Sequence, residues 1–218
     1  MLERLIVCVE EYSMEAALQI LLPRMLGDID FQIIRFQCKD DMLKQLPKRL
    51  KGFSSWLPEN WSILVLVDRD DDDCVKLKAQ LEQMAEEAGF LTKTNALSGP
   101  CLSGPGRSGQ GFKVTNRIII EELEAWYFGD WDAVRTAYPK VAKTIPVKTG
   151  YRDPDAIRGG TWEALERIMK RAGYFSTGLR KTECARQVAQ YMNLQQNRSH
   201  SFKMFYTAVN TIITGSMA

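Results

Sequence analysis

The first 90 residues alternate between short apolar runs and segments with one apolar face. Runs of strand length lie at residues 4–9, 31–38 and 62–68. Apolar residues recur at helical spacing in residues 14–25, in part of 41–57 and in 77–88. Unbroken apolar runs are typical of strands that are covered on both faces. This repeated order predicts an α/β fold with a mainly parallel sheet flanked by helices.

Individual residues predict where these helices begin and end. Ser13 is expected to cap the first helix, and Pro23 is expected to kink or end it. Pro47 is a predicted break in the second helix. Gly89 lies where the third helix is expected to end, because glycine readily adopts the backbone conformation that closes a helix.

The pattern changes in the second half of the chain. A loop rich in Gly, Ser and Pro precedes a further strand and helix, and an irregular segment then precedes three helical patterns. The ranges are 98–111 for the loop, 113–120 for the strand, 121–138 for the helix, 139–160 for the irregular segment, and 161–172, 181–193 and 200–213 for the helical patterns. We therefore expect an α/β domain at 1–138 and a basic helical C-terminal region at 139–218.

Charge is unevenly distributed between these two regions. The net charge is only +2, from 29 Lys and Arg against 27 Asp and Glu. Residues 139–218 hold 13 basic and 5 acidic side chains, and residues 1–138 hold 16 and 22. A basic region of this kind favours binding to a polyanion such as nucleic acid. An uneven solvated surface explains the same asymmetry equally well.

Neither a membrane span nor an export signal is predicted. No apolar run approaches the roughly 20 residues that a membrane helix needs. The N-terminus has charges on both sides of a short apolar run and lacks the layout of a signal peptide. The five cysteines are scattered without a C-x-x-C pair, which favours reduced thiols. We expect a cytoplasmic protein without a membrane partner.

The strongest chemical signal is the stretch "LVLVDRDDDD" at residues 64–73. Alternate residues of an extended chain point the same way, so Asp68, Asp70 and Asp72 can converge. Two carboxylates about 4 Å apart repel by roughly 1 kcal/mol even in water. A hard divalent cation such as Mg²⁺ or Mn²⁺ removes this penalty. An acidic turn that caps the next helix explains Asp72 or Asp73 but not the whole run.

Two named motifs fit this stretch poorly. A calcium-binding loop needs Gly where Asp73 stands and Glu where Ala79 stands, and it follows a helix rather than a strand. A haloacid-dehalogenase phosphatase carries threonine at the position of Asp72. The sequence therefore favours a magnesium site of another type.

Two further acidic groups fall near the same edge of the predicted sheet. Glu10 and Glu11 end the first strand, and ligands of open α/β sheets bind outside the carboxyl ends of the strands. We therefore expect Glu10 and Asp68 to face one crevice. Glu121 and Glu124 are three residues apart at the start of a predicted helix, hence on one helical face. They either complete the metal site or form a charged first turn.

These motifs carry a resemblance to a known family. "LIVCVEEYSMEAAL" followed by "ILVLVDRDDDD" resembles the Toprim fold of topoisomerases, primases and OLD-type nucleases, over residues 4–90. The resemblance implies that Asp68 and Asp70 hold Mg²⁺, with Asp72 as a further ligand. It gives Glu10 the role of general acid and base or ligand. A small residue usually follows the family's glutamate, and here Glu11 does, so the choice between the two stays open.

A narrower likeness spans nearly the whole chain. "EELEAWYFGD", "RDPDAI", "KTECARQVAQYM" and "SHSFKMF" resemble segments of a bacterial family of small, uncharacterised Toprim-like proteins. Genes of that family often lie beside those of ATPases in mobile-element or phage-defence loci. The resemblance implies an ATPase partner and a nuclease activity. A homodimer is left open.

Basic residues supply candidate contacts to nucleic acid. The glycine-rich loop contains a formal G-x-G-x-x-G but does not join a strand to a helix, so it does not predict a dinucleotide site. Arg107 in that loop and Lys113 after it remain candidates for phosphate binding. Arg180, Lys181 and Arg186 lie near one another on or before a basic helix, where a solvated helix face is the alternative.

The expected function is Mg²⁺-dependent hydrolysis of a phosphodiester bond in nucleic acid. Glu10 or Glu11 would transfer protons, and Asp68 and Asp70 would hold the cation. His200 is the single histidine and lies at a predicted helix start, which disfavours a Ser–His–Asp mechanism. The alternatives are a non-catalytic regulatory or docking subunit of an ATPase, and a phosphatase or nucleotide hydrolase that acts on small substrates.

Overall fold

Four parallel strands form the centre of the structure, in the order β2-β1-β3-β4. The computed structural model describes residues 1–94 and 112–215. The strands are β1 (Arg4–Val9), β2 (Asp30–Arg35), β3 (Trp61–Asp68) and β4 (Val114–Ile119). The predicted α/β fold with a parallel sheet is confirmed.

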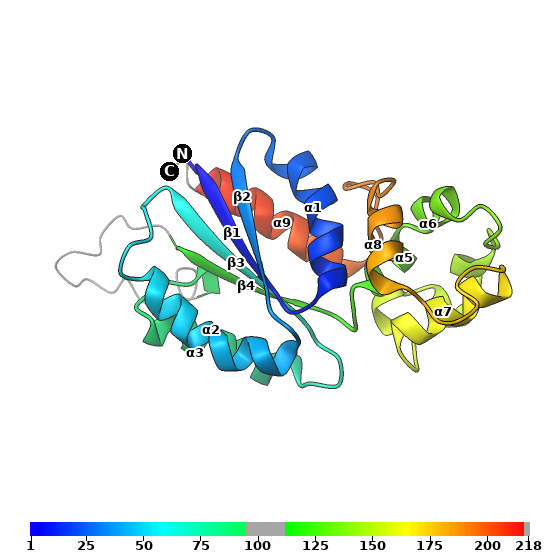
Figure 1. Ribbon diagram of the computed structural model, residues 1–218, viewed down its shortest axis with the longest axis horizontal. Coiled ribbons are helices and arrows are strands. Elements are labelled where there is room, and N and C mark those ends of the chain that lie inside the picture. Colours follow the sequence, from blue (N-terminus) through cyan, green and yellow to red (C-terminus); the bar gives the residue numbers. More distant parts are fainter. Residues whose placement is uncertain (95–111, 216–218) are drawn as a thin grey trace.

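Helices cover both faces of this sheet. Figure 1 shows α1 and α9 on one face and α2 and α3 on the other, with α5 to α8 beyond one end of the strands. The helices are α1 (Tyr12–Leu26), α2 (Lys39–Phe53), α3 (Cys74–Glu87), α5 (Glu124–Gly129), α6 (Trp131–Ala137), α7 (Thr161–Arg171), α8 (Lys181–Ala189) and α9 (His200–Gly215). Short 3-10 turns at Ile145–Val147, Thr149–Tyr151 and Pro154–Ala156 fill the segment predicted to be irregular.

Alternate residues of β1 pack into two separate cores. Leu5 and Val7 lie in the buried cluster that includes residues of α1 and α9. Ile6 and Cys8 lie in the cluster with the buried residues of α2 and α3. Because both faces of the strand are buried, its residues are apolar from Leu5 to Val9, which is why this part of the sequence shows no alternation. Each buried aliphatic side chain contributes about 1.5–3 kcal/mol.

Packing overrides the predicted proline breaks. Helix α1 continues through Pro23 to the buried Leu26, and α2 continues through Pro47 to Phe53, with Leu50 buried. Because the residues after each proline are held by the core, the turn continues despite the lost backbone hydrogen bond. The predicted break at Pro47 was therefore wrong, and α1 does not end at Pro23.

Two helix starts also differ from the sequence prediction. Ser13 does not cap α1; its hydroxyl donates to the carboxylate of Glu11 instead. The single helix expected at 121–138 begins at Glu124 and is divided at Asp130. Asp130 caps α6 by accepting a hydrogen bond of 3.2 Å from the backbone N–H of Ala133.

The C-terminal helices are packed into the core of the sheet domain. Helix α8 lies along α1, where Arg24 donates hydrogen bonds of 3.0 and 2.6 Å to the carbonyls of Ala189 and Met192. Trp126 stacks on Phe205 of α9, with ring centroids 4.9 Å apart. The domain boundary at residue 138 stays a prediction, and one buried cluster contains side chains from both sides of it.

The lengths of the described helices can be compared with the thickness of a bilayer. A bilayer span requires about 20 predominantly apolar residues. The longest helix in residues 1–94 and 112–215 is α9, with 16 residues. No helix in these ranges is both long and apolar enough to cross a membrane.

Candidate functional site

Glu10 and Asp68 meet at the carboxyl edge of the sheet. Glu10 follows β1, and Asp68 is the last residue of the adjacent strand β3. The two strands pair in register up to Val9 and Leu66. The backbone N–H of Asp68 donates a hydrogen bond of 3.0 Å to Oε1 of Glu10. Both side chains are buried, with 6% and 5% of their surface exposed. The structure therefore brings together the two strand ends that carried the strongest motifs.

A cavity of about 480 Å³ opens over these two carboxylates. Carboxylates that end or follow each of the four strands line it, and two lysines join them. The lining includes Glu10, Glu11, Asp40, Asp68, Asp70, Asp71, Asp72, Glu122, Lys39 and Lys181. Its volume lies within the range of pockets that hold small ligands.

Both buried carboxyl groups have an oxygen without a partner. Oε2 of Glu10 and Oδ1 of Asp68 accept no hydrogen bond from any residue that the structure describes. Burial raises the pKa of Glu10 to about 7, although the N–H of Asp68 opposes this shift. Burial and then the charge of Glu10 raise the pKa of Asp68 well above its usual range. An unpaired buried charge is costly, so this pair favours a shared proton or a bound cation.

Lys39, the first residue of α2, supplies a positive charge that the sequence reasoning missed. Its Nζ lies 2.6 Å from Oδ2 of Asp70, 2.9 Å from Oδ2 of Asp72 and 3.0 Å from the carbonyl of Arg69. Burial opposes the charged form, but the bonds to the two aspartates raise the pKa of Lys39. The residue follows β2, so the rule that placed Glu10 and Asp68 at the carboxyl edge could have found it.

The aspartate run divides into residues with different roles. Asp70 adopts a left-handed backbone conformation, with φ of 48°, which asparagine and aspartate tolerate better than most residues. Asp73 caps α3 by accepting hydrogen bonds of 2.9 and 3.1 Å from the backbone N–H groups of Val75 and Lys76. The capping interpretation therefore holds for Asp73.

The arrangement around Lys39 bears on the predicted metal site. Among the residues described, no three or more His, Cys, Asp and Glu side chains form a group that could hold a metal ion as they stand. Asp70 and Asp72 point to the ammonium group of Lys39, which takes the place of a cation for these two side chains. The magnesium site stays a prediction.

Glu121 and Glu124 do not share a helical face, so that prediction was wrong. Glu121 precedes α5 with φ of 62°, and its carboxylate pairs with the guanidinium of Arg69. Glu124 begins α5 and is 1% exposed, and both its oxygens lack a partner among the described residues. Burial raises the pKa of Glu124 to about 7. The pKa of Asp68 is raised first by burial and then by the charges of Glu10, Glu11 and Glu124. Glu124 therefore belongs to the same buried acidic cluster as Asp68.

Lys181 is the second lysine that lines the cavity. It begins α8, and its Nζ lies 3.6 Å from Oε1 of Glu122. Burial opposes its charge, but neighbouring carboxylates, Glu124 first, raise the pKa of Lys181. The adjacent Arg180 is instead paired with Glu183, with Nε and Oε2 2.9 Å apart. Of these two residues, only Lys181 faces the acidic cavity.

The other basic candidates lie elsewhere. Lys113 precedes β4 at the amino edge of the sheet, away from the cavity, where its Nζ lies 3.5 and 3.4 Å from the carbonyls of Pro58 and Trp61. Arg186 lies on α8 beside α1. Arg107 falls outside the described residues. The structure therefore does not gather the five predicted basic residues at one site.

Three of the motifs that carried the narrower resemblance contact one another at the start of α9. Asp155 accepts hydrogen bonds from the hydroxyls of Ser199 at 2.9 Å and Ser201 at 2.7 Å, and also from the backbone N–H of His200. Trp126 donates to the hydroxyl of Ser201 at 3.2 Å. The helix starts at His200, where the sequence placed a helix start. These contacts stabilise the helix start and form no nucleophile–base pair.

Comparison with known families accounts for most of the chain. Residues 9–210 match the family described as "Domain of unknown function (DUF4276)". The chain belongs to the DUF4276 family. Neither the curated proteins nor the solved structures gave a match. The DUF4276 match begins at the last residue of β1 and ends within α9, so the residues that line the acidic cavity lie within it.

Proposed function

We propose that this DUF4276 protein hydrolyses phosphodiester bonds in nucleic acid with the help of a divalent cation. The observation that supports this most is the pair of Glu10 and Asp68. The two are buried side by side at the end of a parallel sheet, each with an unpartnered oxygen that faces no donor in the described chain. Such oxygens cost stability unless a proton or a cation compensates them.

The side chains at the cavity are of the type that binds magnesium or manganese, and Asp70 and Asp72 would exchange the ammonium of Lys39 for the ion. Carboxylate oxygens are the ligands that both ions prefer. Asp68 and Asp70 would hold the ion, and Glu10, Asp72 and Glu124 are the further ligands that the cavity and the buried cluster offer. When bound, a divalent cation offsets charge on the phosphate and makes water a better nucleophile.

Glu10 is suited to move the proton in this reaction. A pKa of about 7 leaves its carboxyl group divided between the two protonation states at neutral pH, so Glu10 accepts and returns protons with similar ease. Its Oε1 is held by the N–H of Asp68, which fixes the orientation of the group. Glu11 instead accepts a hydrogen bond from Ser13. The structure therefore favours Glu10 over Glu11 as the proton carrier in this proposal.

Lys39 and Lys181 are suited to bind phosphate oxygens. Both line the cavity, and neighbouring carboxylates keep both ammonium groups charged. A phosphate that enters the cavity would release its counterions and bind these two ammonium groups instead. The affinity for the phosphate should therefore fall as the salt concentration rises. The remaining basic side chains of residues 139–218 would add weaker contacts to the backbone of a longer substrate.

Hydrolysis of a small phosphorylated substrate is the second candidate function. The cavity volume of about 480 Å³ favours it, because this is large enough for one nucleotide. The same carboxylates and lysines would serve both substrates. The third option, a docking subunit of an ATPase, rests on the Toprim-like resemblance and predicts no hydrolysis at all.

One set of assays separates these functions. The protein is incubated with single- and double-stranded DNA, RNA and nucleoside triphosphates, with Mg²⁺, Mn²⁺ or EDTA, and with or without a candidate ATPase. The proposal predicts cation-dependent cleavage of nucleic acid by wild type and none by the Asp68→Ala, Asp70→Ala double variant. The matched control removes the exposed carboxylates of Asp28 and Asp132 and should cleave like wild type. Equal behaviour of wild type and the Asp68, Asp70 variant in every condition would overturn the proposal.

A further inference from the structure

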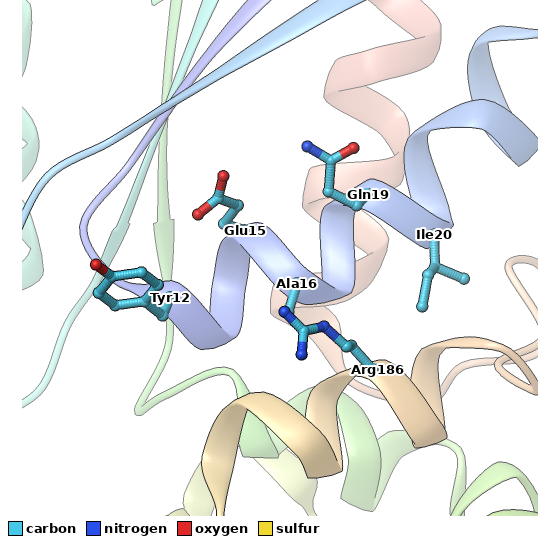
Figure 2. Close-up of a pocket in the computed structure, with 6 residues that line it drawn as sticks. All are labelled: Tyr12, Glu15, Ala16, Gln19, Ile20 and Arg186. Atoms are coloured by element: carbon cyan, nitrogen blue, oxygen red, sulfur yellow. The ribbon is translucent and has the colours of Figure 1, made fainter.

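A second hollow lies beside the acidic cavity, between α1 and α8. Its volume is about 330 Å³, and Tyr12, Glu15, Ala16, Gln19, Ile20 and Arg186 line it. Figure 2 shows Tyr12 at the first turn of α1 and Arg186 on α8, with the guanidinium of Arg186 directed towards α1. The hollow therefore combines an aromatic ring and a cation on two different helices.

Tyr12 is an exposed aromatic ring that is held in place. Its side chain is 58% exposed, an unusual amount for a large aromatic residue. The guanidinium of Arg35 lies 3.4 Å from the ring centroid and covers one face. Arg35 is itself fixed by an ion pair to Glu15, with Nε and Oε2 3.0 Å apart. A ring supported on one face and open to solvent is a ready platform for stacking.

The unpaired charge of the hollow is positive. The carboxylate of Glu15 is offset by Arg35. The guanidinium of Arg186 is exposed and makes no ion pair or hydrogen bond with residues 1–94 or 112–215. A planar guanidinium with free donors matches the oxygens of a phosphate group. The hollow thus complements a ligand with one flat ring and one phosphate.

The hollow and the acidic cavity share the same two elements. Glu11 lines the cavity, and the next residue, Tyr12, lines the hollow. On α8, Lys181 lines the cavity and Arg186 lines the hollow. The two residues are five positions apart, a rise of about 7–8 Å along the helix axis, so α8 contributes one cation to the cavity and another to the hollow.

From these contacts we propose that the hollow binds one unpaired nucleotide of single-stranded nucleic acid, next to the phosphodiester at the acidic cavity. The base stacks on Tyr12, and its phosphate binds Arg186. A base inside a duplex stacks on its neighbours and cannot lie on a protein ring, so the site selects single strands. This inference rests on the proposed function for the position of the cleaved bond, but not for the binding itself.

Binding in EDTA tests the inference separately from cleavage. Fluorescence anisotropy measures the affinity for a labelled oligonucleotide, as single-stranded DNA, as single-stranded RNA and as a duplex. Tyr12→Ala should weaken single-strand binding about tenfold, because stacking of one base contributes about that factor. Tyr12→Phe, which keeps the ring, should bind like wild type. Arg186→Ala should weaken binding, and the slope of log affinity against log salt concentration should become less steep by about one unit.

Matched variants and the duplex arm decide the outcome. Tyr191→Ala and Lys48→Ala remove an exposed ring and an exposed cation elsewhere and should leave affinity unchanged. Equal single-strand affinity of Tyr12→Ala and wild type would overturn the inference, as would equal losses for single strand and duplex. Tyr12-dependent binding without cleavage would refute only the proposed hydrolysis. Cleavage with unchanged binding by Tyr12→Ala would refute only the nucleotide site.

Discussion

The N–H of Asp68 donates a hydrogen bond of 3.0 Å to Oε1 of Glu10, across the adjacent ends of β3 and β1. The backbone of Asp68 therefore fixes the orientation of the carboxyl group of Glu10. Oε1 of Glu10 is thereby engaged, while Oε2 accepts no bond from the described chain. Glu10 is therefore both fixed in position and left with one oxygen for a proton or a cation.

Glu10→Gln should separate these two roles. The amide oxygen of the substituted side chain can still accept the bond from the N–H of Asp68, so the melting temperature should stay within a few degrees of wild type. The amide cannot carry the proton, so cleavage should fall by about 100-fold or more. Glu11→Gln is the matched control and should retain most of the activity. If Glu11→Gln loses cleavage and Glu10→Gln does not, Glu11 is the proton carrier.

Glu124 should make the cation-free protein less stable as pH rises. Its pKa is raised to about 7 by burial, so the folded state holds a proton that the unfolded state releases near pH 4.5. Its contribution to stability is present below pH 4.5 and is lost as pH rises through 7. Glu124→Gln removes this titration. The fall in unfolding free energy between pH 5 and pH 8 should shrink by about 2 kcal/mol.

Urea denaturation in EDTA at the two pH values measures this difference. Glu3→Gln changes an exposed carboxylate and should keep the pH dependence of wild type. An unchanged pH dependence in Glu124→Gln would show that the buried carboxyl group does not titrate in this range.

Lys39→Met should increase the response to magnesium. The ammonium group neutralises Asp70 and Asp72, so its loss should lower the stability of the cation-free protein by about 1 kcal/mol. The same loss removes a competitor for a divalent cation, so the rise in melting temperature on adding Mg²⁺ should exceed that of wild type. Lys44→Met, on the exposed part of α2, is the control. A smaller Mg²⁺ response in Lys39→Met than in wild type contradicts this expectation.

Asp155→Ala should affect stability and not chemistry. Its carboxylate accepts the bonds of Ser199 and Ser201 that fix the start of α9, so the unfolding free energy should fall by about 1–2 kcal/mol. Cleavage per folded molecule should be unchanged. Chemical denaturation and activity assays below the transition measure the two effects, with Asp132→Ala as the exposed control. A fully folded Asp155→Ala protein without activity would place Asp155 in the site.

The sequence predicted the sheet and the meeting of two strand ends because both follow from local pattern. Continuous apolar runs indicated buried strands, and parallel strands place Glu10 and Asp68 at one edge. The same rule places Lys39, which follows β2, at this edge, but the sequence did not indicate that its ammonium group pairs with Asp70 and Asp72. The backbone turn that separates Glu121 from Glu124 was missed because its φ of 62° leaves no mark in a run of helix-forming residues. The break expected at Pro47 failed because core packing outweighed local preference.

Calorimetric titration with Mn²⁺ tests the central claim most directly, because it asks whether the buried carboxylates form a cation site. Wild type is compared with Asp68→Asn, which keeps the size of the side chain, and with Asp71→Asn, which alters an exposed neighbour. We predict saturable Mn²⁺ binding by wild type and Asp71→Asn, weakened at least about tenfold in Asp68→Asn. Equal Mn²⁺ affinity in all three proteins, or none in wild type, would contradict the claim.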